Sequence, residues 1–135
     1  MGRTQVILVD TLVVVWLAFD QGQLSRKARA AIDDARKSAG GLAISHITLL
    51  ELATLVGKGR IRLDISLESF LQEVESRFVV LPMSGKVCAR ATELPDVYPK
   101  DPADRIIGAT ALVEGLPLLT SDRQIRRSKA VRTVW

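Results

Sequence analysis

The chain has 135 residues, of which 47% are hydrophobic and 25% are charged. This length and composition predict one compact globular domain over residues 1–135 and exclude a chain that is disordered throughout. The net charge of +4 favours a polyanionic partner such as nucleic acid. The single cysteine, Cys88, excludes a disulfide framework or a thiolate zinc site, and the single histidine, His46, excludes a histidine-rich metal centre.

Neither a signal peptide nor a membrane span is expected. Met1–Thr4 is too short to flank a signal peptide, and the apolar run Val6–Phe19 has only 14 residues and is interrupted by Asp10. A bilayer span needs about 20 apolar residues. Together with the sparse use of cysteine, this predicts a cytoplasmic location.

Short apolar runs alternate with helical patterns along the whole chain, which predicts an α/β fold. The expected strands are Val6–Val9, Leu42–Ser45, Phe78–Leu81, Leu116–Thr120 and an edge strand within Val131–Trp135. The expected helices outside the Asp101 region are Leu12–Phe19, Ser25–Ser38, Ile47–Val56, Ser66–Arg77, Ser84–Leu94 and the short basic segment Arg123–Arg127. Within these elements we expect Cys88 to be a packing residue, His46 a turn or interface residue, and Tyr98 an exposed residue of the loop before Asp101.

Two aspartates three residues apart, Asp101 and Asp104, stand at the start of a helix whose body, Ile106–Val113, is almost wholly apolar. Asp followed by Pro is typical of a helix start, because the aspartate caps free N–H groups and proline lacks an N–H of its own. A helix that is apolar on every side lies inside a domain, and Gly115 ends this one. A capping box, in which Asp104 reaches back to the cap residue, accounts for the spacing without any function.

Three further acids occupy comparable positions. Asp10 follows the first predicted strand, Asp122 follows the fourth, and Glu51 is the only charged residue of the apolar helix Ile47–Val56. The carboxyl ends of parallel strands meet at one edge of the sheet, where open α/β sheets bind ligands. Asp10 as a plain helix cap and Glu51 as a partner of Lys58 are the alternative interpretations. A lone glutamate is seldom buried unless it is paired or holds a ligand, which favours a functional role for Glu51.

Several carboxylates at one edge of a basic protein predict metal-assisted chemistry. Oxygen ligands without histidine or cysteine suit a hard cation such as Mg²⁺ or Mn²⁺. Clustered carboxylates repel one another unless a cation compensates their charge. A bound metal can activate water and stabilise negative charge on a phosphodiester, while a positive surface holds the polyanion. We therefore predict hydrolysis of phosphodiester bonds.

Four motifs in chain order resemble those of a known family. They are Asp10-Thr11 with Trp16-Leu17, Ser45-x-x-Thr48-x-x-Glu51-Leu52-Ala53, Asp101-Pro102-x-Asp104-Arg105 leading into Ala109-Thr110-Ala111, and Leu119-Thr120-Ser121-Asp122. Over roughly Val6 to Trp135 the chain is similar to PIN-domain proteins, above all the VapC-like ribonuclease toxins of toxin–antitoxin pairs. The resemblance implies that four acids form the catalytic and metal-binding set: Asp10, Glu51, Asp104 and Asp122. It implies that Asp101 is an auxiliary metal ligand. It also implies that Thr120 or Ser121 helps to hold the metal or its water.

The same resemblance implies a three-layer α/β/α sandwich around a mostly parallel sheet, dependence on Mg²⁺ or Mn²⁺, and cleavage of single-stranded or structured RNA. It further implies a homodimer, or a heterotetramer or larger assembly with an antitoxin whose tail enters the acidic groove. Two other functions stay open. One is a PIN nuclease that processes RNA or DNA ends without being a toxin. The other is a non-catalytic domain that binds nucleic acid or protein and uses its acids as helix caps.

Overall fold

The computed structural model describes residues 6–135, and the expectation for Met1–Thr4 lies outside that range. Within it, a five-stranded sheet runs through the centre of the molecule in the order β3-β2-β1-β4-β5, and every neighbouring pair of strands is parallel. The strands are β1 (Ile7–Val9), β2 (Leu42–Ser45), β3 (Val79–Leu81), β4 (Leu118–Leu119) and β5 (Thr133–Val134). All five predicted strands are therefore confirmed, and all except β2 are shorter than predicted.

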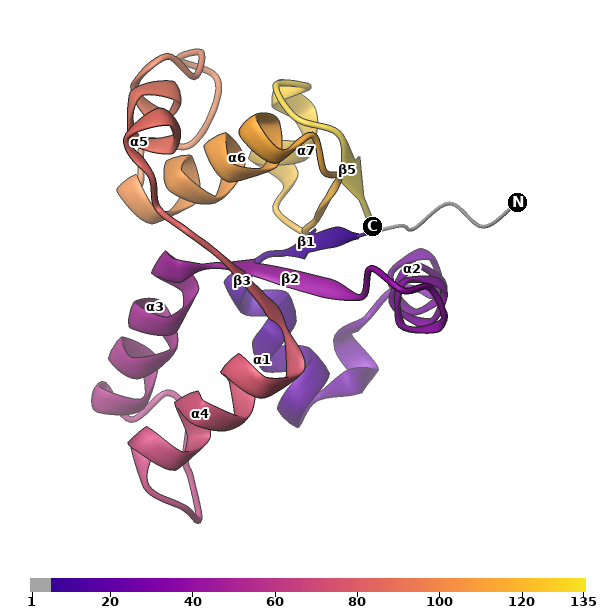
Figure 1. Cartoon of the computed structure of the whole chain (residues 1–135), viewed down its shortest axis with the longest axis vertical. Helices are drawn as coiled ribbons and strands as arrows, with labels where there is room; N and C mark the ends of the chain where they lie inside the picture. The colour runs from indigo at the N-terminus through magenta and orange to yellow at the C-terminus, as the bar shows by residue number, and fades with distance from the viewer. Residues whose placement is uncertain (1–5) are drawn as a thin grey trace.

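Helices cover both faces of this sheet (Figure 1). One face carries α1 (Thr11–Phe19), α2 (Arg26–Lys37), α3 (His46–Gly57) and α4 (Leu67–Arg77). The other carries α5 (Gly85–Thr92), α6 (Pro102–Glu114) and α7 (Arg123–Ser128), and a short 3₁₀ turn, η1 (Gln21–Gln23), follows α1. The three-layer α/β/α sandwich is thus confirmed. None of the helices in the described part of the chain is long and apolar enough to span a membrane.

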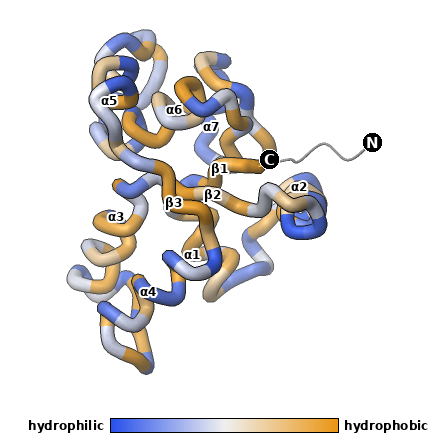
Figure 2. The backbone as a smooth tube through the Cα atoms, in the orientation of Figure 1, coloured by the Kyte–Doolittle hydropathy of each residue, from blue (hydrophilic) through white to orange (hydrophobic). Residues whose placement is uncertain are grey.

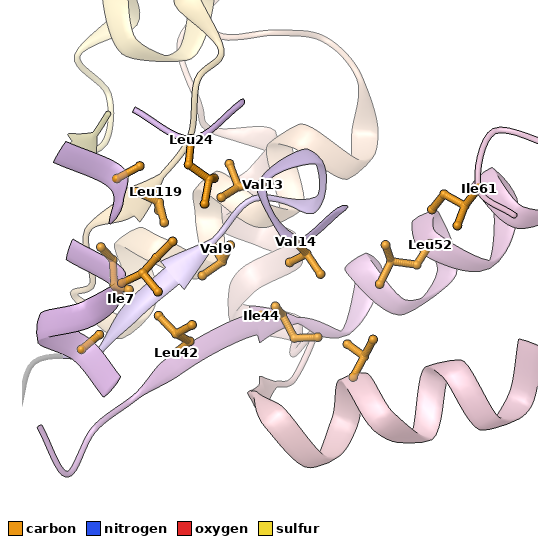
Figure 3. Close-up of a cluster of buried hydrophobic side chains, with 14 of the residues drawn as sticks. Ile7, Val9, Val13, Val14, Leu24, Leu42, Ile44, Leu52, Ile61 and Leu119 are labelled. Carbon is orange, nitrogen blue, oxygen red and sulfur yellow. The ribbon is translucent and has the colours of Figure 1, made fainter. Parts of the chain in front are cut away.

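The hydrophobic core lies on both faces of the sheet, because successive strand residues point to opposite sides. Ile7 and Val9 of β1 join the cluster formed with α1 to α4, whereas Leu8 between them joins the cluster beneath α6 and α7. Figure 3 shows the first cluster, and Figure 2 shows that the three strands β1, β2 and β3 are hydrophobic along their length. Strands buried on both faces are typical of parallel sheets, which explains the unbroken apolar runs in the sequence.

The strand order places β1 at the point where the chain changes direction across the sheet. From β1 the chain moves outward through β2 to β3, and it then returns to add β4 on the opposite side of β1. The helices that follow β1 and β4 therefore leave toward opposite faces, and a crevice opens between the carboxyl ends of these two strands. The Asp10 N–H donates to the Leu119 carbonyl oxygen at 3.0 Å, which brings the ends of the two strands together.

Two predictions for the layer of α5 and α6 are wrong. Tyr98, expected to be exposed, is fully buried among the residues under α6, and Cys88, expected to pack in the core, is exposed on α5. The α5 residues that do pack inward are Val87 and Ala91, four positions apart on one helix face, and Cys88 lies outside that stripe. Tyr98 is buried because its ring fills the space above Gly108.

Gly108 of α6 allows the ring of Tyr98 to lie directly on the helix. A Cβ atom built on Gly108 would stand 2.7 Å from Cζ of Tyr98, closer than real Cβ contacts come. The Tyr98 hydroxyl donates to the carbonyl oxygen of Asp104 at 3.1 Å, so the buried polar group is satisfied. This contact holds the first turn of α6 against the loop before it.

We therefore expect Gly108→Ala to destabilise the fold by about 1–3 kcal/mol, the usual cost of overpacking a filled core. Gly57→Ala, at the last residue of α3, is the matched control, since no atom lies within 4 Å of its added Cβ. Urea unfolding of both variants measures the difference. Equal stability of the two variants would contradict the close packing of Tyr98 on α6.

Candidate functional site

Three of the five candidate acids are helix N-caps at the carboxyl edge of the sheet. Asp10 accepts the N–H of Thr11 at the start of α1, Asp101 accepts the N–H groups of Ala103 and Asp104 at the start of α6, and Asp122 accepts that of Ile125 in α7. The interpretation of these three aspartates as helix caps is therefore correct. In Asp101 and Asp122 the caps use one carboxylate oxygen each, Oδ1, and no hydrogen bond of the described chain engages the other.

Asp10 and Asp122 are joined across the crevice between β1 and β4 by a single buried hydroxyl. Thr120 Oγ1 donates to Asp10 Oδ2 at 2.7 Å and accepts the backbone N–H of Asp122 at 3.1 Å. Thr120 is fully buried, and both bonds are partly buried. The two strand ends that the sequence places 110 residues apart are therefore fixed at the switch point of the sheet.

Glu51 reaches the same edge from α3 and is held by two buried threonines. Thr11 Oγ1 donates to Glu51 Oε1 at 2.5 Å and lies 3.0 Å from Thr48 Oγ1. Because the Thr11 hydroxyl proton is used by the carboxylate, Thr48 is the donor to Thr11. Glu51 does not reach Lys58, so the alternative interpretation of a pair between them is wrong in the described structure.

The remaining acid, Asp104, lies in the first turn of α6, partly buried. Its own N–H is bonded to Asp101, but its carboxylate forms no hydrogen bond back to the cap, so the predicted capping box is only half formed among the described residues. Burial, followed by the charges of Asp10, Asp101, Glu51 and Asp122, raises the pKa of Asp104 to about 7. All five acids therefore share one electrostatic neighbourhood.

The pKa values of Asp10 and Glu51, which are also partly buried, shift in the same direction. Burial raises the pKa of Asp10, and the hydrogen bonds from Thr120 and Thr11 oppose that rise. Burial also raises the pKa of Glu51, with Asp10 adding to the rise and the Thr11 hydroxyl opposing it. Carboxyl groups shift in this way when negative charges are gathered away from water without a compensating cation.

Arg105, the cation nearest in sequence to Asp104, does not neutralise these acids. The guanidinium of Arg105 donates to carbonyl oxygens of α5 and of the loop between α5 and α6, at distances of 3.1–3.4 Å: those of Ala91, Leu94, Pro95 and Tyr98. In the part of the chain that the structure describes, the one ion pair within 4.0 Å joins Arg77 to Glu73 on α4. The acids therefore face one another without a protein cation between them.

Within the described residues, the acids do not form a closed cage. No set of three or more His, Cys, Asp or Glu side chains within residues 6–135 is gathered closely enough to enclose a metal ion. Mg²⁺ does not need such a cage, because it is usually bound through one or two carboxylates and keeps several of its waters. The donor set, oxygen alone, fits a hard cation of this kind.

Two threonines support the site although the sequence motifs that contain them assign them no role. Thr11 and Thr48 are both buried, and both support Glu51. The available signal is position, since Thr48 lies three residues before Glu51 and therefore on the same face of α3. Arg105 and Tyr98, which fix the loop onto α6, carry no such local signal.

A doubly wound parallel sheet with acids gathered at its switch point is the layout of an α/β protein that binds its ligand at that edge. Comparison with known proteins identifies the family within this class. The family model of the PIN domain matches residues 7–130, and the chain belongs to that family. Ribonuclease VapC22 of Mycobacterium tuberculosis is 37% identical over 131 residues, covering 96% of this chain and 98% of that protein.

Solved structures agree with this assignment. The crystal structure of VapBC2 from Rickettsia felis, bound to a DNA fragment from their promoter, superposes with a TM-score of 0.71 at 19% identity, over 96% of this chain and 97% of that one. That likeness concerns the fold alone. A toxin–antitoxin complex from Klebsiella pneumoniae is 26% identical, with a TM-score of 0.60 and 86% of each chain covered.

The pKa of Asp104 predicts how the metal-free protein responds to pH. A carboxyl with a pKa near 3.9 when unfolded and about 7 when folded contributes its full stabilisation below pH 4 and loses it as the pH rises toward 7, because the unfolded chain releases the proton first. We expect the free energy of unfolding to decline less with rising pH in Asp104→Asn, because this variant lacks the titrating carboxyl. Urea unfolding in a chelator at pH 4.5 and 7.5 measures it, with Asp34→Asn on the exposed face of α2 as control. A decline as steep in Asp104→Asn as in the control would show that the carboxyl is not shifted.

Proposed function

We propose that this protein is a metal-dependent endoribonuclease and the toxin of a toxin–antitoxin pair. The observation that carries the proposal is the gathering of five carboxylates at the switch point of the sheet with no protein cation of the described chain among them. The likeness to a protein named a ribonuclease, over nearly the full length of both chains, supports RNA as the substrate. The net charge of +4 of the whole chain suits a polyanion held near a metal.

The metal would be held by the acids that lie around the end of β1. Asp10, Glu51, Asp104 and Asp122 are the proposed catalytic set, all four are proposed metal ligands, and Asp101 is an auxiliary one. The preferred ion is Mg²⁺ or Mn²⁺, because the donors are carboxylate oxygens alone. When bound, such an ion supplies positive charge that stabilises a phosphodiester under attack and lowers the pKa of a bound water.

The protein's own groups would prepare this site before the substrate arrives. Thr120 orients Asp10 through Oδ2 and fixes the backbone of Asp122, so these two carboxylates keep their places at the strand ends. Glu51 is oriented by Thr11, and its pKa is raised by burial and by the neighbouring acids. A carboxylate with a raised pKa is a better base, and we assign to Glu51 the acceptance of a proton from the attacking water.

The assembly belongs to the same proposal. Solved structures of similar fold are complexes named VapBC and FitAB, and one at 26% identity is named a toxin–antitoxin complex. We propose an antitoxin partner that brings a cation to the acids, a homodimer of this chain, and a heterotetramer or larger assembly with the antitoxin. We also propose that the protein is cytoplasmic and that residues 1–135 form one domain.

A second candidate is a non-catalytic binding domain, and the three N-caps favour it. Asp10, Asp101 and Asp122 each stabilise a helix start, which accounts for their positions without chemistry. Asparagine caps a helix about as well as aspartate but carries no charge. Substitution by asparagine therefore separates a capping role from a metal-binding one.

We expect Asp10→Asn and Asp104→Asn each to abolish RNA cleavage in Mn²⁺ while the fold is retained, a loss of at least about 100-fold for removal of a charged ligand. The measurement is cleavage of a total RNA pool with and without chelator, followed by mapping of the cut ends. Asp34→Asn is the control for loss of one surface acid. A folded Asp10→Asn or Asp104→Asn protein that cuts at the wild-type rate would contradict the metal-site assignment, and wild-type protein that cuts no RNA would favour the non-catalytic binding domain.

The free protein is expected to be a dimer. The chain has a mass of 14.8 kDa, so light scattering should give about twice that value. Large apolar side chains are exposed on α3 and on the segments around β3, among them Leu50, Val79 and Met83, and a dimer would cover apolar surface of this kind. A mass near that of one chain across micromolar concentrations would contradict the dimer.

A further inference from the structure

A basic pocket lies at the C-terminal ends of α6 and α7. It has a volume of about 550 Å³ and is formed by the last turn of α6, the last turn of α7 and the segment that leads into β5. These three elements lie together in Figure 1, in orange to yellow. Arg126 on α7 follows Asp122 by only one turn, and its N–H donates to the Asp122 carbonyl oxygen at 3.0 Å. Along α6, in contrast, Asp101 and the pocket stand at opposite ends of a helix 13 residues long. At 1.5 Å per residue this is about 20 Å.

Three cationic side chains line the pocket: Arg126, Lys129 and Arg132. All three are exposed, and none forms an ion pair with another described residue. None of the described residues that line the pocket is acidic or aromatic, and the rest of its wall is largely apolar. Such an arrangement concentrates positive charge around a concave surface without neutralising it.

The pocket is held in shape by hydrogen bonds that leave its positive charges unneutralised. The Arg132 guanidinium donates to the Gly115 carbonyl oxygen at 3.4 Å, which fixes it at the rim. Ser128 Oγ donates to the Ile125 carbonyl oxygen at 2.6 Å and accepts the Ala130 N–H at 3.2 Å, so the turn after α7 is fixed. In that turn Lys129 adopts φ +55°, a conformation that non-glycine residues seldom take.

We propose that this pocket is a second binding site for the RNA substrate, which takes the phosphate backbone of a strand whose scissile bond lies at the acids. The inference rests on the proposed function, because it assumes that RNA is the substrate. Separated cations without an aromatic ring suit phosphates, which bind through charge, whereas unpaired bases are usually stacked on aromatic side chains. A strand that rises about 3.4 Å per nucleotide covers the length of α6 with about six nucleotides. The pocket therefore favours long RNA over short RNA without reading its sequence.

The test measures binding apart from cleavage. A fluorescent 20-nucleotide RNA is titrated with the full chain in a chelator at several salt concentrations, and the binding is followed by anisotropy. The pocket variant is Arg126→Gln with Lys129→Gln, and the control is Arg26→Gln with Lys27→Gln, which removes two exposed charges at the start of α2. Two lost phosphate contacts should reduce the slope of log affinity against log salt by about 1.4, since each contact to a single strand contributes about 0.7. The control should keep the wild-type slope.

A second arm measures cleavage in Mn²⁺. The pocket variant should show a KM for the 20-nucleotide RNA raised about 3-fold or more, with kcat unchanged and with no change in KM for a dinucleotide, whose single phosphodiester occupies the acids. Equal salt slopes and equal KM values for the pocket variant and the control would overturn the inference, while cleavage by the wild type would leave the proposed function intact. Failure of the wild type to cut any RNA would instead overturn the proposed function, and the binding arm would still decide whether the pocket holds phosphates.

An acidic segment of a protein partner is the competing occupant. A ten-residue polyglutamate peptide is titrated in the same way. Loss of peptide binding in the pocket variant, with RNA binding unchanged, would show that the pocket takes a protein segment and that the RNA proposal is wrong. Loss of RNA binding with peptide binding unchanged would support it.

Discussion

The hydrogen bond from Thr120 to Asp10 is the interaction on which the candidate site depends. It joins the ends of β1 and β4, the only two neighbouring strands in the described sheet between which the order of the chain reverses. The doubly wound topology creates a crevice at this point whatever the side chains are. The buried hydroxyl turns the crevice into a site, because it fixes the carboxylate of Asp10 and the backbone of Asp122 with one atom.

Several negative charges are gathered around this bond, and their burial and repulsion lower the free energy of unfolding. Burial and mutual repulsion raise the pKa values of Asp10, Glu51 and Asp104, and no protein cation relieves them in the described chain. Structures keep such strained groups where function requires them, because packing elsewhere outweighs the cost. Here that packing is the apolar body of α6, with Tyr98 seated on Gly108, and the four bonds of Arg105 that tie α5 and the preceding loop to α6.

How far the sequence predicts this protein depends on the range of the interactions. Strands, helices and caps follow from local patterns, so the sequence alone places Asp10, Asp101 and Asp122 at strand ends and helix starts. The position of Asp104 beside Asp10 follows from the parallel topology, which alternating strands and helices imply. The burial of Tyr98 is not predictable in this way, because it depends on the missing side chain of Gly108 on another element. The prediction for Cys88 is wrong for a local reason. The residues of α5 that face the core are Val87 and Ala91, and Cys88 is one position away from Val87.

One consequence of the three N-caps concerns how the acids are neutralised before any metal binds. The helices α1, α6 and α7 all begin at this edge, so the positive ends of three helix macrodipoles converge on it. Each helix start is equivalent to about half a positive charge, which offsets part of the repulsion among the carboxylates. The backbone thus supplies a fixed, non-exchangeable counter-charge at this edge. The proposed metal would therefore balance only the part of the negative charge that the three helix starts leave over.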